Sequence, residues 1–312
     1  MTRPQAHEVS STVLWPWILV ALAAHTGWGA YPVFVRYLQT VSLLPSMSLL
    51  AVGSMVAFIG LLLFFRPHLE WRIFRSRLLW VFAAVLIARA ITNLLSAKFT
   101  LAIYVQLINL MTPFLVVLLS VTLLKDRIPP YTGRTILIAF IGALLMMSGD
   151  ISKTGLSVSL TSSDWLGMGL ALFSSFSLAT YLILVRRTVH HNITGDALLV
   201  VQLAAIVAVS LPLSLLLGED WNRWRELQNF DWLVIAAFSL GVLLGANLGQ
   251  IGALRQLGAP LVSSLLAWRL VVALVVAAFL LDERLTSPWQ LLGALIVVLT
   301  ISWYLWQQRH FF

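Results

Sequence analysis

The stretch APLVSSLLAWRLVVALVVAAFLL, from Ala259 to Leu281, is apolar over the length of a membrane span and carries Arg269 close to its middle. About 20 apolar residues in a helix cross the ~30 Å hydrocarbon core of a bilayer. An Arg at the centre of such a helix costs about 2.5–3.5 kcal/mol on insertion scales, so it is rarely kept unless it faces a cavity or a partner. We therefore expect Arg269 to face the protein interior.

A second interior cation is expected in the apolar segment from Leu78 to Phe99, which carries Arg89 at similar depth. The acidic residues all fall in expected loops or at expected helix ends. They are Glu8, Glu70, Asp126, Asp150, Asp164, Asp196, Glu219, Asp220, Glu226, Asp231, Asp282 and Glu283. The membrane interior is thus expected to hold positive charge and no carboxylate, which predicts a ligand that brings its own negative charge.

The composition excludes an ordinary soluble protein. Of the 312 residues, 60% are hydrophobic and 10% are charged, and the mean hydropathy is +0.93. The formal net charge of +8 does not indicate nucleic-acid binding, because the basic residues lie at the ends of apolar runs. The chain has no Cys, which excludes disulfides, thiolate metal sites and a Cys nucleophile.

Ten segments approach membrane length, and they are continuously apolar rather than alternating, which predicts helices rather than a barrel. They are Trp15–Arg36, Leu43–Phe65, Leu78–Phe99, Leu101–Leu124, Gly133–Gly149, Trp165–Val185, Ala197–Leu217, Trp232–Leu254, Ala259–Leu281 and Trp289–Trp306. The first apolar run is too long for a cleaved signal peptide and predicts a first span. We expect an all-α integral membrane protein with ten transmembrane helices.

The two halves of the chain show weak internal similarity. A shift of 157 lays Lys98 on Arg255 and the sequence KDRI at 125–128 on DERL at 282–285. A shift of 150 lays Tyr31, Val35 and Arg36 on Tyr181, Val185 and Arg186. The alternative is chance similarity among Leu-rich helices. If the repeat is real, residues 1–149 and 150–312 each hold five spans, and the odd number inverts the second unit, as in many secondary transporters.

These features together resemble the EamA type of the drug/metabolite transporter superfamily. The resemblance rests on the five-plus-five spans, Trp28-Gly29, Pro113 and the two closing patterns at 125–128 and 282–285. It implies substrate movement by alternating access. The chain departs from the family pattern at Asp126, where Glu is usual, and at Arg269-Leu270, where the ninth helix usually has a Glu-Pro pair. The second departure reverses the charge at the expected site.

Arg269 and Arg89 are the leading candidates for binding an anionic group, because a guanidinium offers a planar fork to carboxylate or phosphate. For Arg269 the alternative is a cap on the carbonyls of a broken helix or a pair with a loop acid. Arg89 shares a helical stripe with Asn93, Ser96 and Thr100, at offsets of four, seven and eleven. That stripe predicts either a cavity lining or hydrogen bonds between helices.

His25 heads a second stripe with Trp28, Gly29 and Pro32. It is the single candidate for proton coupling, and a hydrogen-bonded core His is the alternative. Further polar residues could orient a ligand or simply join helices. The full set of expected substrate-binding residues is Arg269, Arg89, Asn93, His25, Trp28, Gln106, Asn109, Tyr181, Asn247, Gln250 and Trp268.

The expected function is secondary transport of a small organic anion or zwitterionic metabolite, as an exporter or exchanger. No phosphate-binding loop, zinc motif or catalytic constellation stands out, so we expect no enzyme, no cofactor and no metal. Two alternatives are efflux of hydrophobic or cationic drugs and a lipid-binding scaffold that transports nothing. Twelve Lys and Arg residues against six favour cytoplasmic N- and C-termini, in a multi-pass protein of the bacterial inner (plasma) membrane. The sequence assigns no oligomeric state.

Overall fold

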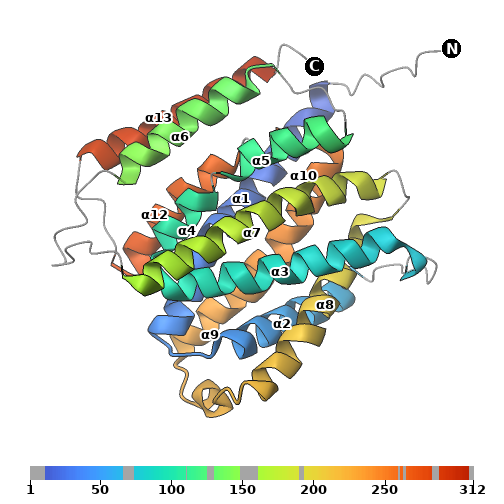
Figure 1. Ribbon diagram of the computed structural model, residues 1–312, viewed down its shortest axis with the longest axis vertical. Coiled ribbons are helices and arrows are strands. Elements are labelled where there is room, and N and C mark those ends of the chain that lie inside the picture. Colours follow the sequence, from blue (N-terminus) through green and yellow to red (C-terminus); the bar gives the residue numbers. More distant parts are fainter. Residues whose placement is uncertain are drawn as a thin grey trace.

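The protein is all-helical over the residues that its computed structural model describes, and no strand occurs among them (Figure 1). The described residues are 11–65, 74–109, 111–124, 130–147, 161–189, 193–258, 261–262, 265–282 and 288–308. The all-α fold expected from the continuous apolar runs is confirmed for this part of the chain.

Six helical segments in the described ranges are long and apolar enough to cross a bilayer. They are α1 (Ser11–Thr40), α2 (Ser46–Phe65), α3 (Arg77–Phe99), α7 (Ser162–Val189), α8 (Gly195–Leu216) and the composite of α9 (Asn229–Ala236), η5 (Ala237–Ala246) and α10 (Asn247–Leu257). Shorter apolar helices occupy the other four expected spans, among them α6 (Thr132–Met147) and α13 (Pro288–Gln308). The largest differences from the expected helix ends are in α1, which continues past Arg36 to Thr40, and in α7, which continues past Val185 to Val189.

Two expected spans are built from separate helical pieces. The fourth consists of α4 (Ala102–Asn109), α5 (Thr112–Leu119) and the π-helical turn η2 (Ser120–Leu124). Pro113 lies in the first turn of α5, where its missing N–H costs no helical hydrogen bond. In the described part of the ninth, the 3₁₀ turn η6 (Leu265–Ala267) precedes α12 (Trp268–Leu280). Arg269 is therefore the second residue of a short helix, and not the centre of a long one.

The eighth span changes helical type midway. Its central segment, η5, is a π-helix of 10 residues between two α-helices. π-Helical segments widen the backbone and often occur at functional sites. Here the segment ends directly before Asn247 on α10, so the polar face of α10 begins where the π-helix stops.

Helix α1 packs against α3, α4, α10, α12 and η5, which places it inside the bundle. The other close pairs are α3 with α7, α2 with α8, and α6 with α13, and Figure 1 shows α6 and α13 side by side along one edge. A Cβ added to Gly29 would lie 2.7 Å from Cβ of Val272 and 2.8 Å from the carbonyl oxygen of Arg269. Glycine is thus required for the approach of α1 to α12.

One end of the bundle, where α1 and α3 end and α2 and α7 begin, is called the distal face. A chain of hydrogen bonds joins three helices there. Nη1 of Arg36 on α1 donates to the carbonyl of Thr100 at 2.7 Å, just after α3. Oγ1 of Thr100 donates to Oδ1 of Asp164 on α7 at 3.1 Å.

Two further carboxylates hold the distal face together. Oδ1 of Asp231 on α9 accepts from the hydroxyls of Tyr37 and Ser42, at 3.1 and 2.8 Å. Glu219, after α8, accepts from the backbone N–H groups of Met47 and Ser48 at 2.9 and 2.7 Å. That carboxylate satisfies donors in the first turn of α2, which have no partner within the helix.

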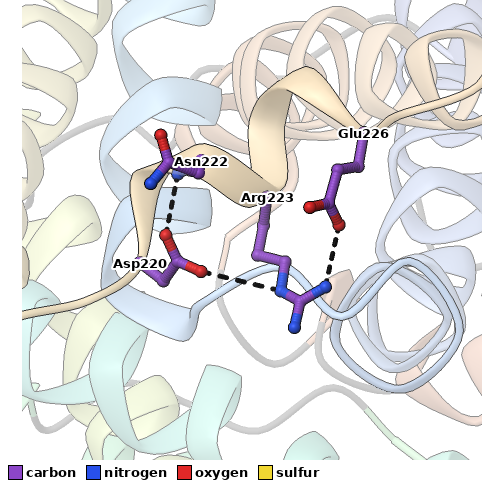
Figure 2. Close-up of polar contacts among 4 residues, drawn as sticks. All are labelled: Asp220, Asn222, Arg223 and Glu226. Carbon is purple, nitrogen blue, oxygen red and sulfur yellow. Dashed lines mark hydrogen bonds and ion pairs between the residues drawn. The ribbon is translucent and has the colours of Figure 1, made fainter.

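The described acids lie in loops or in first helical turns, as expected. They are Asp164, Asp196, Glu219, Asp220, Glu226, Asp231 and Asp282. Figure 2 shows the loop around η4 (Trp221–Arg225), where Arg223 lies 3.8 Å from Asp220 and 2.8 Å from Glu226. The other acids, most of the two closing patterns, and the pair His190-His191 lie outside the described residues.

Candidate functional site

Arg89 lies inside the bundle between two aromatic rings. Its side chain is 4% exposed. The carbon of its guanidinium lies 4.6 Å from the ring centroid of Trp28 and 5.2 Å from that of Tyr181. Within the described part of the chain it makes no hydrogen bond and no ion pair. Two aromatic faces stabilise the cation, and its N–H donors are left for another group.

Arg269 is equally buried, at 3% exposed, but it has neutral partners. Its Nε donates to Nδ1 of His25 at 2.8 Å, and its Nη2 donates to Oε1 of Gln250 at 3.3 Å. The described residues provide no acid that forms an ion pair with it. The expected excess of interior positive charge is therefore present, because neither buried Arg is neutralised by a carboxylate of these residues.

The bonds of His25 define its tautomer. Nδ1 accepts from Arg269, so it carries no proton. Nε2 lies 2.9 Å from the carbonyl oxygen of Val262 and must donate to it. In this arrangement His25 is neutral, with its proton on Nε2, and both ring nitrogens are used.

Trp28 lies between the two cations. Its indole is in contact with the guanidinium of Arg89, and the guanidinium of Arg269 lies 5.5 Å from the ring centroid. The indole Nε1 is buried and has no hydrogen-bond partner among the described residues. Nε2 of Gln106 donates to the backbone carbonyl of Trp28 at 3.1 Å, which holds this turn of α1 against α4.

Two more polar atoms near the cations are buried and have no hydrogen-bond partner in the described ranges. Oδ1 of Asn93 is one, and it lies one helical turn from Arg89 on α3. Nε2 of Gln250 is the other, on the same amide that accepts from Arg269. Buried polar atoms without partners are rare in proteins, and each one calls for an explanation such as a ligand or a water molecule.

A hydrogen-bonded row closes one side of the site. The hydroxyl of Tyr181 donates to Oε1 of Gln202 at 3.5 Å, and Nε2 of Gln202 donates to Oδ1 of Asn247 at 2.9 Å. Nδ2 of Asn247 donates to the carbonyl of Leu243 at 2.8 Å. Gln202 was not expected at the site. The sequence feature that could have indicated it is a single Gln in an apolar segment whose other polar residues are Ser210 and Ser214.

The space around these residues forms two lobes that share Trp28, Arg89 and Asn93. The polar lobe has room for about one water molecule and is also lined by Gln106, Asn109, Ser174, Leu178 and Arg269. The second lobe is similarly small. Its lining comprises six aliphatic side chains and, besides the shared residues, Tyr31, Gln202 and Asn247. The two lobes therefore meet at the guanidinium of Arg89.

The structure brings ten of the eleven expected site residues into this region. Trp268 is the exception. Its Nε1 donates to Oγ1 of Thr26 at 3.0 Å in an exposed setting, and it lines neither lobe. The expected lining by the first, third, fourth, sixth, eighth and ninth spans was incomplete, because α2 contributes Leu50 and α8 contributes Gln202.

A separate groove lies toward the end of the bundle where α8 begins and α10 ends, here called the proximal face. It has an empty volume of about 530 Å³ and is lined by Trp17 on α1, Asp196 on α8 and Arg255 on α10, among others. Ile251 of α10 lines it as well, one residue after Gln250 of the central site. The described residues contain no cluster of three or more metal-ligating side chains.

Comparison with known proteins finds one family model that matches part of the chain and a solved structure of similar fold. Residues 15–148 match the sequence model of the EamA-like transporter family. No curated protein matches the chain. Among solved structures, one crystal structure superposes with a TM-score of 0.68 at 16% sequence identity, over 93% of this chain and 96% of the other. At this identity the similarity concerns the fold alone.

Proposed function

From the EamA-like transporter domain that residues 15–148 form, we propose that the protein moves a small organic anion or zwitterionic metabolite across the membrane by alternating access. Family membership implies an integral membrane protein that acts as a drug/metabolite transporter and not as an enzyme. The substrate class is our inference. It rests on Arg89, a buried cation whose contacts are aromatic faces and whose donors are unused.

The electrostatic argument favours an anion. Burying a cation without a paired charge is costly, and an unpaired hydrogen-bonding group adds to the cost. An oxyanion at the junction of the two lobes would accept from Arg89 and from the free Nε1 of Trp28. A cationic substrate would meet two guanidinium groups there, and repulsion would oppose its entry.

We also propose the ten-span, inverted-repeat architecture, with units at 1–149 and 150–312. The packing supports it, because exchanging the units converts the closest helix pairs into other close pairs or into themselves. The contact of α3 with α7 becomes that of α10 with α1, and the contact of α1 with α12 becomes that of α7 with α4 and α5. The pairs α2 with α8 and α6 with α13 map onto themselves.

The two ends of the bundle differ in a way that suits alternating access. At the distal face, Asp164, Glu219 and Asp231 join helices across the bundle. At the proximal face, a groove approaches the site along α10. We propose that this arrangement is closed distally and that the substrate leaves or enters through the proximal groove. With Lys and Arg in excess on the side of both termini, that face is the cytoplasmic one.

The test is solute flux in sealed proteoliposomes, with size-matched probes of permanent charge. Butanesulfonate, butanesulfonamide and butyltrimethylammonium supply an anion, a neutral molecule and a cation. We expect accelerated flux of the anion alone, and at least a tenfold loss in Arg89→Gln. Arg223→Gln is the matched control, because Arg223 is a partly exposed Arg in the loop of Figure 2.

Each other outcome has a distinct meaning. Faster flux of the cation would indicate drug efflux instead. Equal losses for the anion and the neutral probe in Arg89→Gln would exclude direct contact of Arg89 with the charged group. Protein that accelerates no solute but retains anionic lipid through purification would indicate a lipid-binding scaffold.

A further inference from the structure

The proximal groove is large enough to hold a small organic molecule. It has room for roughly fifteen water molecules, whereas each lobe of the central site has room for about one. Side chains of both charges line the groove, Asp196 in the first turn of α8 and Arg255 in the last turn of α10. Asp196 is exposed and Arg255 is partly exposed, so both can contact a solute in the groove.

The backbone at the start of α8 holds Arg255 beside Asp196. Nη1 of Arg255 donates to the carbonyl of Ile193 at 2.7 Å, three residues before Asp196. A Cβ added to Gly195 would lie 3.7 Å from Cδ of Arg255. Within the described ranges, no ion pair joins Asp196 to Arg255. A guanidinium has five N–H donors, so it can bind the backbone and a ligand together.

An indole forms a further wall of the groove. Trp17 on α1 lies against Gly252 of α10, where an added Cβ would lie 2.7 Å from Cζ3 of the ring. Glycine is thus required for the indole to pack this close to α10. Because Trp attracts cations to its face, the groove offers a carboxylate and an indole to an ammonium group. It offers the guanidinium of Arg255 to an oxyanion.

We propose that the proximal groove binds a zwitterionic metabolite, with its ammonium at Asp196 and Trp17 and its oxyanion at Arg255. This inference rests on the proposed function and narrows its substrate class to a zwitterion. A solute of one charge would meet one attractive and one repulsive side chain in the groove. Because Ile251 of the groove follows Gln250 of the central site, the groove holds the substrate beside the site that it enters.

The two charges also suit the helix ends at which they lie. An acid stabilises a helix N-terminus and a base stabilises a C-terminus. That role would affect the stability of α8 and α10 and would give no preference between ligands. The test therefore compares ligands that differ in one group.

The matched pair is 3-aminopropanesulfonate and butanesulfonate, in which an ammonium replaces a methyl at the same chain length. Binding of each radiolabelled ligand is measured by equilibrium dialysis, with the protein in phosphatidylcholine nanodiscs and empty nanodiscs subtracted. The measurement is made in the wild type and in Arg89→Gln, which removes binding at Arg89. We expect the aminosulfonate to bind about fivefold more tightly in both, as for one partly exposed ion pair. Equal affinities would overturn the inference.

Two variants locate the ligand. Asp196→Asn should abolish the preference for the aminosulfonate without weakening butanesulfonate, and Arg255→Gln should weaken both ligands. The matched controls are Asp220→Asn and Arg223→Gln in the loop of Figure 2. If Asp196→Asn keeps the preference, as Asp220→Asn should, the ammonium lies elsewhere and the inference is overturned. A lower unfolding temperature with the preference kept would show that Asp196 acts only at the helix end.

A zwitterionic lipid headgroup offers the same chemistry as a free solute, so a further arm separates the two sources. Phosphatidylethanolamine has a primary ammonium that can donate to Asp196, whereas the choline group of phosphatidylcholine cannot. Binding is repeated in nanodiscs that contain phosphatidylethanolamine. Unchanged aminosulfonate affinity supports a free zwitterion, and a lower affinity assigns the groove to the lipid and overturns the substrate class.

The flux of butanesulfonate tests the proposed function separately. If the wild type accelerates this flux while the groove shows no preference for the aminosulfonate, this inference alone fails. If neither ligand binds and neither is transported, the proposed function fails as well.

Discussion

Nε of Arg269 donates a 2.8 Å hydrogen bond to Nδ1 of His25, 244 residues earlier in the chain. A buried cation is thereby held by a neutral ring, and the ring is held in turn by the carbonyl of Val262. An anion that engages Arg269 would compete with Nδ1 of His25 for the guanidinium. Substrate binding and the protonation state of His25 are thus linked through one hydrogen bond.

This link predicts the pH dependence of transport. Nδ1 can take a proton only when it gives up its bond from Arg269, and an anion bound to Arg269 favours that exchange. We expect wild-type anion flux to rise as the pH falls, because a proton on Nδ1 of His25 frees the guanidinium of Arg269 for the anion. His25→Gln should flatten this profile, measured as initial flux between pH 5.5 and 8. A profile that His25→Gln leaves unchanged would remove His25 from any coupling.

The interaction between His25 and Arg269 can also be measured through the free energy of unfolding. Arg269→Gln should reduce transport at least tenfold and lower the free energy of unfolding by about 1–3 kcal/mol, the cost of unsatisfied buried groups. His25→Gln, Arg269→Gln and the double variant form a cycle, read by thermal unfolding in detergent. We expect a coupling energy of about 0.5–3 kcal/mol, as for residues in contact. Additive effects would contradict the hydrogen bond, and loss of folded protein in Arg269→Gln would indicate a purely structural Arg.

Trp28 offers an aromatic face to the two guanidinium groups and offers its Nε1 donor to a ligand. One substitution separates these two roles. Trp28→Phe keeps an aromatic face for the two guanidinium groups but removes the unpartnered Nε1 donor. We expect anion affinity to fall about tenfold, the loss of one hydrogen bond to a charged group at ~1.5 kcal/mol. The unfolding temperature should change little. Unchanged affinity in equilibrium dialysis would show that Nε1 does not contact the ligand.

Gly29 offers a test of how α1 meets α12. Gly29→Ala would place a methyl 2.7 Å from Cβ of Val272, so the two helices must separate. We expect a destabilisation of about 1–3 kcal/mol, typical of overpacking. Gly169→Ala on α7 is the control, since nothing lies within 4 Å of its added Cβ. A Gly29→Ala protein as stable as the control would contradict the close approach.

The sequence predicted the helical stripes well because they depend on local periodicity. Arg89, Asn93, Ser96 and Thr100 were expected on one face of a helix, and all four are buried. The pairing of His25 with Arg269 could not be predicted, because it joins helices that are distant in the chain.

Two placements differ from the expected ones, and each difference has a physical reason. Trp268 was expected at the site beside Arg269, but neighbouring residues on a helix point about 100° apart, and Trp268 bonds to Thr26 at the surface. Gln202 was missed because its partners, Tyr181 and Asn247, come from other helices. The sequence pattern of one helix does not indicate which residues of other helices it contacts.

The last prediction concerns Asp164, one of the distal carboxylates, and the opening of the distal face. Asp164 accepts from Thr100, whose carbonyl in turn binds Arg36, so Asp164→Asn should loosen the contact of α7 with α3 and α1. The chain has no Cys, so Ser96→Cys supplies one buried thiol a turn before Thr100. We expect Asp164→Asn to raise its labelling by a membrane-impermeant maleimide at least fivefold. Asp220→Asn in the exposed loop is the control. Equal labelling in the two variants would mean that Asp164 does not hold the distal face closed.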